Sequence, residues 1–296
     1  MLLAGPGRTA TLLGANSGRV TRRFIARDPV KTVAVSRDGS RIAVASGRRV
    51  DVFRTNGAHE MTISHPASVT SVAFSPDGSV VTGDERGMGR IWSTGGELTR
   101  TLRSGRKPIA DIAVSPDGRS VALASEDGAA RIIAADSGKL EHRLVGHRDA
   151  LTSVAFSPDG RLVLTASRDH DARLWDSVTG APVQVLRWHF GRVGDASFGP
   201  DGRWILTAGP VTVGLWQPEV REPVLPYGFG GNTSLLTSAV FDPSGTHVLS
   251  TAEDGSVRRA ACEVCGEREA LLSLADAQLR RIGRKLTAEE RERYGL

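Results

Sequence analysis

The sequence predicts an all-β fold built from repeated antiparallel sheets, and two observations carry this prediction. Apolar and polar residues alternate in short runs, as in residues 151–157 and 161–167, which is the period of a strand with one buried face. Turn sequences such as Pro158-Asp159-Gly160 separate these runs, and their Gly residues suit the backbone conformations of tight turns. We therefore expect hairpin-linked strands over most of the 296 residues.

The turn sequence recurs at a nearly constant spacing. Its glycines, which lie 39 to 43 residues apart, are Gly39, Gly78, Gly118, Gly160, Gly202 and Gly245. A period of about 40 residues is typical of one four-stranded blade of a β-propeller. One blade alone cannot bury both faces of its sheet, so we expect the blades to pack face to face around a ring.

Residues 146–176, GHRDALTSVAFSPDGRLVLTASRDHDARLWD, contain the most complete copy of the repeat. Gly146-His147 opens this unit, Ser-Pro-Asp-Gly at 157–160 forms its first turn, and Leu-Trp-Asp at 174–176 closes its third strand. In this order and within one period, the three signals resemble a WD40 repeat. The resemblance implies an all-β, WD40-like β-propeller.

We expect seven blades, of which the first is incomplete. Residues 1–18 align without a gap to residues 163–180, so the chain begins inside the second strand of a blade, and residues 20–25 supply its outer strand. The chain thus looks like the C-terminal piece of a longer propeller protein, or a gene product that starts late. Six further inner strands are predicted near residues 30–35, 69–74, 109–114, 151–156, 193–198 and 236–241. The alternative is six blades, with residues 20–25 completing the last unit, which lacks an outer strand.

The predicted propeller covers residues 1–265, with the partial first blade at 1–28, and a helical tail follows at 266–296. Apolar residues of the tail follow a helical period from Leu271 to Ile282, and Gly283 ends that helix. The tail resembles the segment after the last repeat of many actinobacterial WD40 proteins, whose N-terminal parts often carry signalling domains. The resemblance implies a scaffold or sensor piece of a larger bacterial signalling protein.

WD40 blades commonly contain a buried polar tetrad, which the resemblance places in the fourth complete unit. Its members are His147, Thr165 or Ser167, Asp169 and Trp175. We expect these side chains to be structural, because no nucleophile elbow or oxyanion motif accompanies them. The other units depart from the pattern; one has Arg86 where the Asp belongs.

The composition narrows the function classes. No P-loop and no His-Glu-x-x-His motif occurs, so we expect no cofactor, no small-molecule substrate and no catalysis. Cys262 and Cys265 have the spacing of half a zinc site or of a redox dithiol, but the tail supplies no further Cys or His. We therefore expect no metal site and treat both as small residues. Without a membrane span, a signal peptide or a disulfide framework, the chain is predicted to be cytoplasmic.

The strongest functional signal is a set of basic residues on the loops that share one rim of the predicted ring. We define this basic rim by Arg48, Arg49, Arg86, Arg106, Lys107, Arg148, Arg168 and Arg192, with Phe190 among them. Arg together with an aromatic residue is what interface hot spots favour. We expect the rim to bind a protein or peptide, with acidic or phosphorylated segments as the fitting chemistry.

Three other interpretations of these residues stay open. The acidic residues Asp84, Glu85, Asp149 and Asp171 interrupt the rim, which favours a scattered solvated surface as much as a site. The Arg excess also suggests a nucleic-acid-binding propeller, although few aromatic residues accompany it. A hydrolase on a propeller scaffold is the third alternative. For Phe190, a ring packed in the core is as well supported as an exposed anchor.

Overall fold

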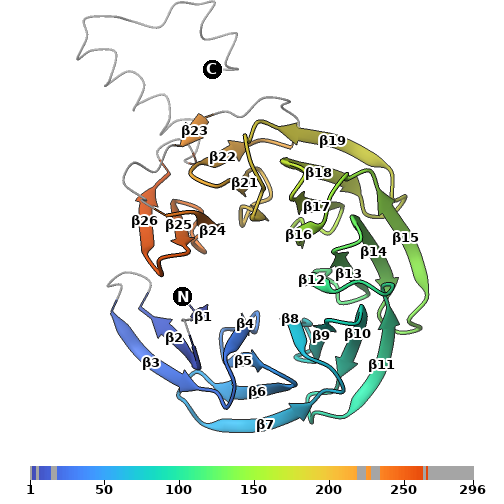
Figure 1. Cartoon of the computed structure of the whole chain (residues 1–296), viewed down its shortest axis with the longest axis vertical. Coiled ribbons are helices and arrows are strands. Elements are labelled where there is room, and N and C mark those ends of the chain that lie inside the picture. Colours follow the sequence, from blue (N-terminus) through green and yellow to red (C-terminus); the bar gives the residue numbers. More distant parts are fainter. Residues whose placement is uncertain are drawn as a thin grey trace, which may run out of the picture.

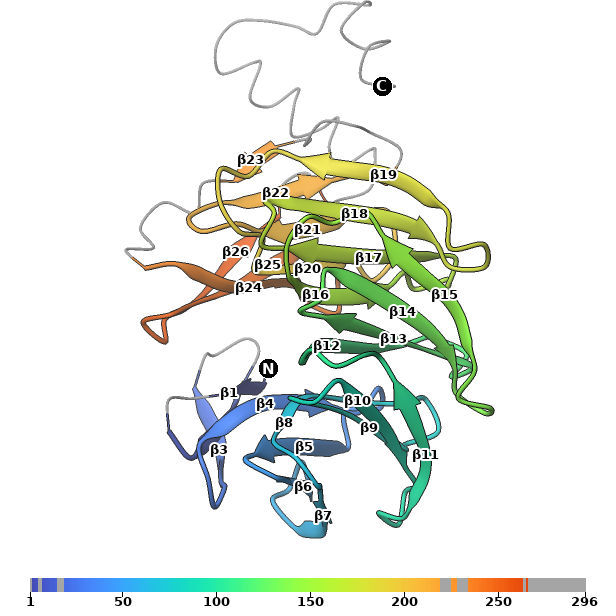
Figure 2. The same cartoon turned by 45° about the vertical axis from the view of Figure 1, so that its right-hand side comes forward.

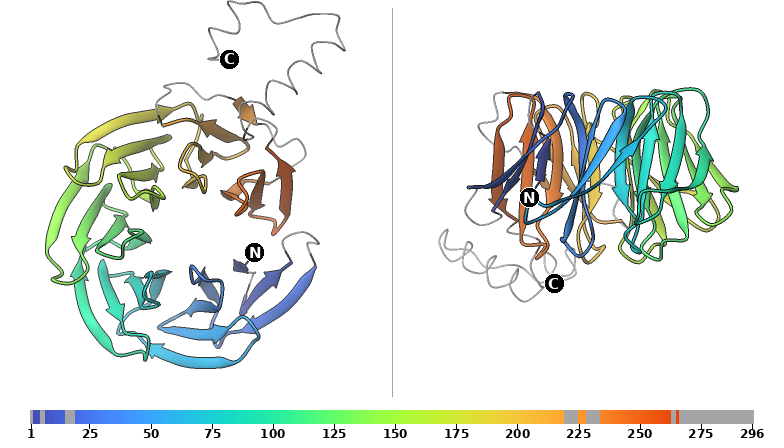
Figure 3. Two further views of the ribbon diagram at one scale, coloured as in Figure 1. Left: turned by 180° about the vertical axis from the view of Figure 1, so that it is seen from behind. Right: turned by 90° about the horizontal axis from the view of Figure 1, so that it is seen from below.

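The computed structural model describes residues 2–4, 7–14, 19–218, 225–227, 234–262 and 265. The described residues form 26 strands in seven antiparallel sheets, which stand around a common axis like the blades of a propeller (Figure 1). From the side the molecule is a thick disc whose strands cross from one face to the other (Figure 3). The predicted all-β propeller is confirmed. In these ranges no helix is long and apolar enough to cross a membrane.

Five sheets have four strands each, in sequence order from the axis outward. They comprise β4 (Val30–Val35), β5 (Arg41–Ser46), β6 (Arg49–Arg54) and β7 (His59–Ser64); β8 (Val69–Phe74), β9 (Val80–Asp84), β10 (Met88–Trp92) and β11 (Leu98–Arg103); β12 (Ile109–Val114), β13 (Ser120–Ser125), β14 (Ala129–Ala134) and β15 (Leu140–Val145); β16 (Leu151–Phe156), β17 (Leu162–Ser167), β18 (Asp171–Asp176) and β19 (Pro182–Arg187); and β20 (Asp195–Phe198), β21 (Ile205–Ala208), β22 (Val213–Trp216) and β23 (Leu225–Tyr227).

Two sheets have three strands in the described part of the chain, and they stand next to each other where the two ends of the ring meet (Figure 2). The first consists of β1 (Leu2–Ala4), β2 (Thr9–Leu13) and β3 (Val20–Ile25), and the last of β24 (Leu236–Phe241), β25 (His247–Ala252) and β26 (Val257–Ala261). In the six-blade alternative β3 would pair with β26. Instead β3 pairs with β2, so the described strands form seven sheets.

The Ser-Pro-Asp-Gly turn between the first and second strands is built by local hydrogen bonds. In residues 157–160, Asp159 Oδ1 accepts hydrogen bonds from Ser157 Oγ at 2.6 Å and from Arg161 N at 3.0 Å. Gly160 closes the turn with φ of 75°, a left-handed conformation that Gly adopts without a steric cost. The turn therefore sets the register of each hairpin from its own sequence.

The core lies between neighbouring sheets. Leu164 and Ala166 of β17 pack in one cluster with Val193 and Ala196, which belong to the inner strand and its approach in the next sheet. The same relation holds for the other consecutive sheets from β4–β7 to β24–β26, so the second strands β5, β9, β13, β17 and β21 are each covered by the next inner strand. Leu164, Ala166, Val193 and Ala196 are each at most 2% exposed. Burial on both faces explains why the second strands are nearly continuous apolar runs.

Three details differ from the predictions or lie beyond the described residues. Strand β20 begins at Asp195, two residues later than expected, because Gly194 N already donates to Ala208 O in an irregular approach. Cys262 and Cys265 are joined by a disulfide, which corrects their interpretation as unlinked small residues; Cys265 N donates to Cys262 O at 3.2 Å, and their Cα atoms lie 5.3 Å apart. The predicted helices of residues 266–296 lie outside the described residues.

Candidate functional site

The basic rim surrounds one mouth of the central opening. A cavity of about 320 Å³ lies there, lined by the first residues of six inner strands or of their approaches. Its polar lining residues include Lys31, Thr70, Glu126, Thr152, Arg168, Arg192 and Thr237. Only Arg168 and Arg192 of the predicted rim border this cavity. Lys31, which sequence reasoning missed, adds a third cation; its position as the second residue of a predicted inner strand was the available signal.

Four rim cations are exposed and make neither an ion pair nor a side-chain hydrogen bond with any described residue. They are Arg86, Arg106, Lys107 and Arg148. By contrast, Arg192 lies 2.6 Å from Glu253, and Arg168 lies 3.8 Å from Glu126. Unpaired guanidinium groups keep all their donors available for a ligand carboxylate or phosphate.

The other two rim arginines are less available to a ligand. Arg48 is exposed, but its Nε donates to the carbonyl oxygen of His65 at 3.2 Å. Arg49 begins β6 and is partly buried, and its Nε has no hydrogen-bond partner among the described residues. These two arginines therefore contribute less to the exposed charge of the rim than the four unpaired cations do.

Three of the four unpaired cations stand on loops that touch. Ser104 N donates to Gly87 O at 3.0 Å, which joins the β11–β12 loop to the β9–β10 turn. A Cβ atom at Gly87 would lie only 2.6 Å from Lys107 O, and Gly87 has φ of 78°, so this close approach requires Gly. Arg86 is thereby held beside the loop of Arg106 and Lys107.

Two of the acidic residues that interrupt the rim in sequence are not part of its surface. Asp84 is fully buried: Oδ1 accepts hydrogen bonds from Arg86 N and Met88 N, and Oδ2 from Arg90 Nη1 at 2.7 Å. Asp171 is 7% exposed and accepts two hydrogen bonds from Arg187. Only Glu85 and Asp149 of the four remain exposed, so the rim is more basic than its sequence suggests.

Phe190 projects from the loop between β19 and β20 and is 98% exposed, so the alternative that its ring packs in the core does not hold. The neighbouring His189 is buried instead, and its Nε2 lies 2.7 Å from Thr207 Oγ1. The buried His anchors the loop and leaves the adjacent aromatic ring outside. An exposed aromatic side chain beside arginines is a suitable anchor for a binding partner.

The tetrad residues meet in a buried network between β17, β18 and the loop before β16. His147 Nδ1 lies 2.9 Å from Asp169 Oδ2, and Nε2 lies 2.8 Å from Thr165 Oγ1, which also accepts Trp175 Nε1–H at 2.9 Å. Thr165 is thus the hydroxyl of the tetrad. Ser167 instead bonds the backbone, donating to Ala150 O and accepting from Asp169 N.

The electrostatics of the tetrad suit a structural role. Burial lowers the pKa of His147, although the carboxylate of Asp169 opposes this shift. The pKa of Asp169 is also lowered, because hydrogen bonds from Arg148 N, Asp171 N and His147 outweigh its burial. Thr165 is fully buried and shares its oxygen with the Trp175 indole, so it has no free approach to a substrate.

The sheet of β8–β11 contains a similar buried polar network built from different residues. Its His65 Nε2 lies 3.0 Å from Arg90 Nη1, which donates to Asp84, and Trp92 Nε1 donates to Thr82 Oγ1 at 2.9 Å. Burial, with the nearby Arg90 charge, lowers the pKa of His65 to about 4. The Asp that the pattern lacks at Arg86 is therefore replaced by Asp84 acting through Arg90.

The opposite mouth of the central opening has different chemistry. A cavity of about 530 Å³ is lined there by the ends of the inner strands and by the Pro-containing turns that follow them. Its apolar lining residues include Phe74, Phe156, Phe198 and Phe241 with Pro76, Pro116, Pro158, Pro200 and Pro243. One mouth is thus basic and the other apolar.

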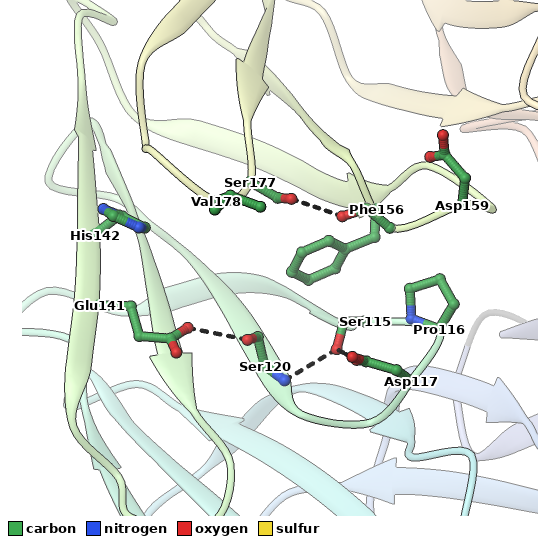
Figure 4. Close-up of a pocket in the computed structure, with 11 residues that line it drawn as sticks. Ser115, Pro116, Asp117, Ser120, Glu141, His142, Phe156, Asp159, Ser177 and Val178 are labelled. Atoms are coloured by element: carbon green, nitrogen blue, oxygen red, sulfur yellow. Dashed lines mark hydrogen bonds between the residues drawn. The ribbon is translucent and has the colours of Figure 1, made fainter.

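A third hollow, of about 480 Å³, lies between the sheets of β12–β15 and β16–β19 (Figure 4). Its polar groups bond each other: Ser120 Oγ donates to Glu141 Oε2 at 2.9 Å, and Ser115 Oγ to Asp117 Oδ1 at 2.7 Å. An equivalent groove of about 400 Å³ recurs one sheet further on, beside Asp159 and Asp201. A groove that repeats with the sheets is a feature of the fold and not a special site.

In the described part of the chain no group of three His, Cys, Asp or Glu residues is placed to hold a metal ion.

Comparison with known proteins identifies the repeats. Five segments, residues 57–93, 96–133, 138–176, 180–210 and 224–258, match the family described as "WD domain, G-beta repeat", and together they cover more than half of the chain. An uncharacterized WD repeat-containing protein of Synechocystis is 37% identical to the chain over 101 residues. That match spans 31% of this chain and 29% of the relative, so it covers less than a third of either protein.

Proposed function

Because the chain belongs to the WD40-repeat family of β-propellers, we propose that it is a non-catalytic binding platform that captures an acidic or phosphorylated protein segment on its basic rim. The observation that carries this proposal is the set of four exposed, unpaired cations on adjacent loops: Arg86, Arg106, Lys107 and Arg148. Arg binds a carboxylate or phosphate with two parallel hydrogen bonds, so such a segment fits this surface.

The geometry of the mouth supports an extended ligand. The 320 Å³ cavity adds Lys31, Arg168 and Arg192 at the ring axis, and Phe190 offers an aromatic anchor at the edge. A segment that runs from the unpaired cations to this mouth would also meet Lys31 and the two paired arginines. Glu126 and Glu253 already hold Arg168 and Arg192 in place, which reduces the entropy that these side chains lose on binding.

The proposal includes the setting of the platform. We assign the propeller, residues 1–265, and the following tail, residues 266–296, to a scaffold or sensor part of a larger bacterial signalling protein in the cytoplasm. The resemblance of the tail to those of actinobacterial WD40 proteins supports this assignment.

A matched pair of charge reversals tests the binding face. The rim variant carries Arg106→Glu, Lys107→Glu and Arg148→Glu. The control variant changes Arg119, Arg161 and Arg203 to Glu; all three are exposed, follow the turn glycines on the opposite face, and give the same change in net charge. Binding of a fluorescein-labelled acidic peptide, with and without phosphoserine, is measured by anisotropy. We expect at least tenfold weaker binding for the rim variant and an unchanged affinity for the control.

Three results would contradict the proposal. Equal losses in the two variants would mean that net charge alone attracts the peptide. Tighter binding of a single-stranded oligonucleotide than of either peptide, with a steep salt dependence lost only in the rim variant, would favour the nucleic-acid alternative. Turnover of an esterase, phosphatase or lactonase substrate that His147→Ala abolishes without unfolding would favour the hydrolase alternative.

A further inference from the structure

One residue at the apolar mouth departs from the repeat. Five of the turns that follow the inner strands carry Pro at the same position, and these are Pro76, Pro116, Pro158, Pro200 and Pro243. The turn between β4 and β5 carries Arg37 there instead. Arg37 and all five prolines line the 530 Å³ cavity of this mouth. At this position of the turns, the mouth is therefore apolar except for one guanidinium group.

The prolines have a packing role that Arg37 does not take. A Cβ atom at Gly118 would lie 3.4 Å from Pro76 Cδ, and the glycines of the next three turns approach the preceding Pro in the same way, at 3.4–3.6 Å. Each of these prolines thus packs on the next turn around the ring. At Gly78, which comes after Arg37 in this order, the nearest atoms belong to Arg41 and Thr94. Departures from a local rule of this kind are expected where a residue serves function.

The Arg37 side chain reaches along the mouth. Its Nη1 donates to Pro116 O at 3.2 Å. Arg37 belongs to the sheet of β4–β7 and Pro116 to the sheet of β12–β15, so the side chain passes the turn of the sheet between them, which carries Pro76. Because Arg37 and both prolines line the cavity, the guanidinium group lies at the apolar mouth.

The guanidinium group keeps donors for a ligand. Arg37 forms no ion pair with any described residue, and its bond to Pro116 O uses one of five N–H groups. The edge formed by Nε and Nη2 is the one that holds a carboxylate with two parallel hydrogen bonds. Asp242, the one carboxylate among the described lining residues, is 8% exposed and accepts from Ser244 Oγ at 2.8 Å and from His247 N at 3.1 Å. Asp242 is therefore already bonded and leaves Arg37 to a ligand.

Aromatic rings form much of the wall beside this cation. Phe74, Phe156, Phe198 and Phe241 end their inner strands, line the cavity and are each partly exposed. Val240 also lines the cavity and is 37% exposed. A concave apolar site of several hundred Å³ with one well-placed polar group is typical of a site that holds an apolar group in a fixed orientation.

We infer that the apolar mouth binds the C-terminal residue of a partner polypeptide, with an apolar side chain among the Phe rings and the terminal carboxylate on Arg37. The charge supports this occupant, because one unpaired cation beside apolar walls matches one carboxylate next to one apolar side chain. Capture of a C-terminal carboxylate is a known mode of peptide recognition. The inference does not depend on the function proposed for the basic rim, which lies on the opposite face.

The probe is a peptide of sequence Ser-Gly-Ser-Gly-Ser-Phe with fluorescein at its N-terminus and a free C-terminus, and the same peptide with a C-terminal amide is its control. Binding to the full chain is measured by anisotropy. We expect saturable one-to-one binding of the acid and at least tenfold weaker binding of the amide, because the amide cannot accept two charge-assisted hydrogen bonds from Arg37. A free-acid peptide that ends in Ser in place of Phe should also bind at least tenfold more weakly.

A matched pair of protein variants locates the site. Arg37→Pro restores the residue of the other five turns, and Pro fits there because Arg37 N donates in no backbone hydrogen bond among the described residues. Arg119→Gln removes an exposed cation from the same face that does not line the cavity. We expect Arg37→Pro to keep its melting temperature and to bind acid and amide equally weakly. Arg119→Gln and the rim variant should bind the acid peptide as the parent does.

Four results would overturn the inference. Absence of binding, or equal affinity of the parent for acid and amide, would remove the carboxylate from the site. A loss in Arg119→Gln as large as in Arg37→Pro would show that only the charge of the face matters. Binding of 3-phenylpropionate as tight as that of the peptide would assign the mouth to a free acid. Dimers of the full chain that Arg37→Pro dissociates in sedimentation would assign it to a second copy.

Discussion

Replacing Asp111 with Asn tests the electrostatics of the ring axis. Asp111 is the third residue of β12, where its Oδ1 accepts Ser71 Oγ–H at 3.2 Å and its Oδ2 accepts Val154 N–H at 3.0 Å. Burial raises the pKa of Asp111 to about 7, and the charge of Asp195 adds to this rise, although the Val154 N–H opposes it. Asn keeps both contacts, since its oxygen accepts from Val154 N and its amide donates to Ser71 Oγ.

The sign and size of the effect follow from this raised pKa. Because the pKa in the folded protein exceeds the ordinary value of 3.8, the folded state binds the proton more tightly than the unfolded state between pH values of about 4 and 7. The contribution of Asp111 to the free energy of unfolding therefore falls as the pH rises through this window. The rise of the Asp111 pKa from 3.8 to about 7 corresponds to about 4 kcal/mol. The side chain is only partly buried, so we expect about 2 kcal/mol.

Urea unfolding of both proteins at pH 5 and pH 8 measures the effect. We expect Asp111→Asn to be about 2 kcal/mol more stable than the parent at pH 8 and to lack the part of the pH dependence that comes from Asp111, so that the difference in stability between the two proteins grows from pH 5 to pH 8. Asp117→Asn is the control: the Ser115 hydroxyl and Arg119 N–H lower the pKa of Asp117, so its removal should destabilise at neutral pH. Asp111→Asn with lower stability at pH 8 and an unchanged pH slope would refute the reasoning.

Two further substitutions test the polar network and one turn. Thr165→Val leaves the buried donor Trp175 Nε1 and the His147 ring without their shared oxygen. We therefore expect the free energy of unfolding in urea to fall by about 2–4 kcal/mol, against less than about 1 kcal/mol for the exposed Thr237→Val. Equal losses in the two variants would contradict this role of Thr165. His170 is the one non-Gly residue with a positive φ, 75°, among the described residues. His170→Gly should therefore raise stability by about 1 kcal/mol, and a loss of stability would show that the imidazole makes a needed contact.

Much of the fold was predictable because the relevant physics is local. Alternation with period two and the Pro-Asp-Gly turns specify strands and hairpins within a few residues, so the strand positions agree closely with expectation. The gapless alignment of residues 1–18 with 163–180 also anticipated the register of β1 on β2. Strand β20 begins two residues later than predicted, after an irregular approach through Gly194 that alternation alone does not reveal.

The rim was predictable in its membership but not in its chemistry. A blade repeat indicates which loops share a face, and this placed Arg106 and Arg148 on one rim. It does not indicate which carboxylates turn inward, and Asp84 does so because three donors converge on it from different positions. The sequence left the exposure of Phe190 open for the same reason. It does not indicate whether a ring next to a buried His packs in the core or projects into solvent.

The sequence by itself thus determined the strand-and-turn repeat, its period and the polar tetrad, because each depends on residues within one unit. The tertiary structure alone decided which rim cations remain unpaired, that Phe residues collect at the opposite mouth, and that Cys262 and Cys265 are bonded. These properties arise between units. They depend on how neighbouring sheets cover each other, which is a property of the ring and not of any one repeat.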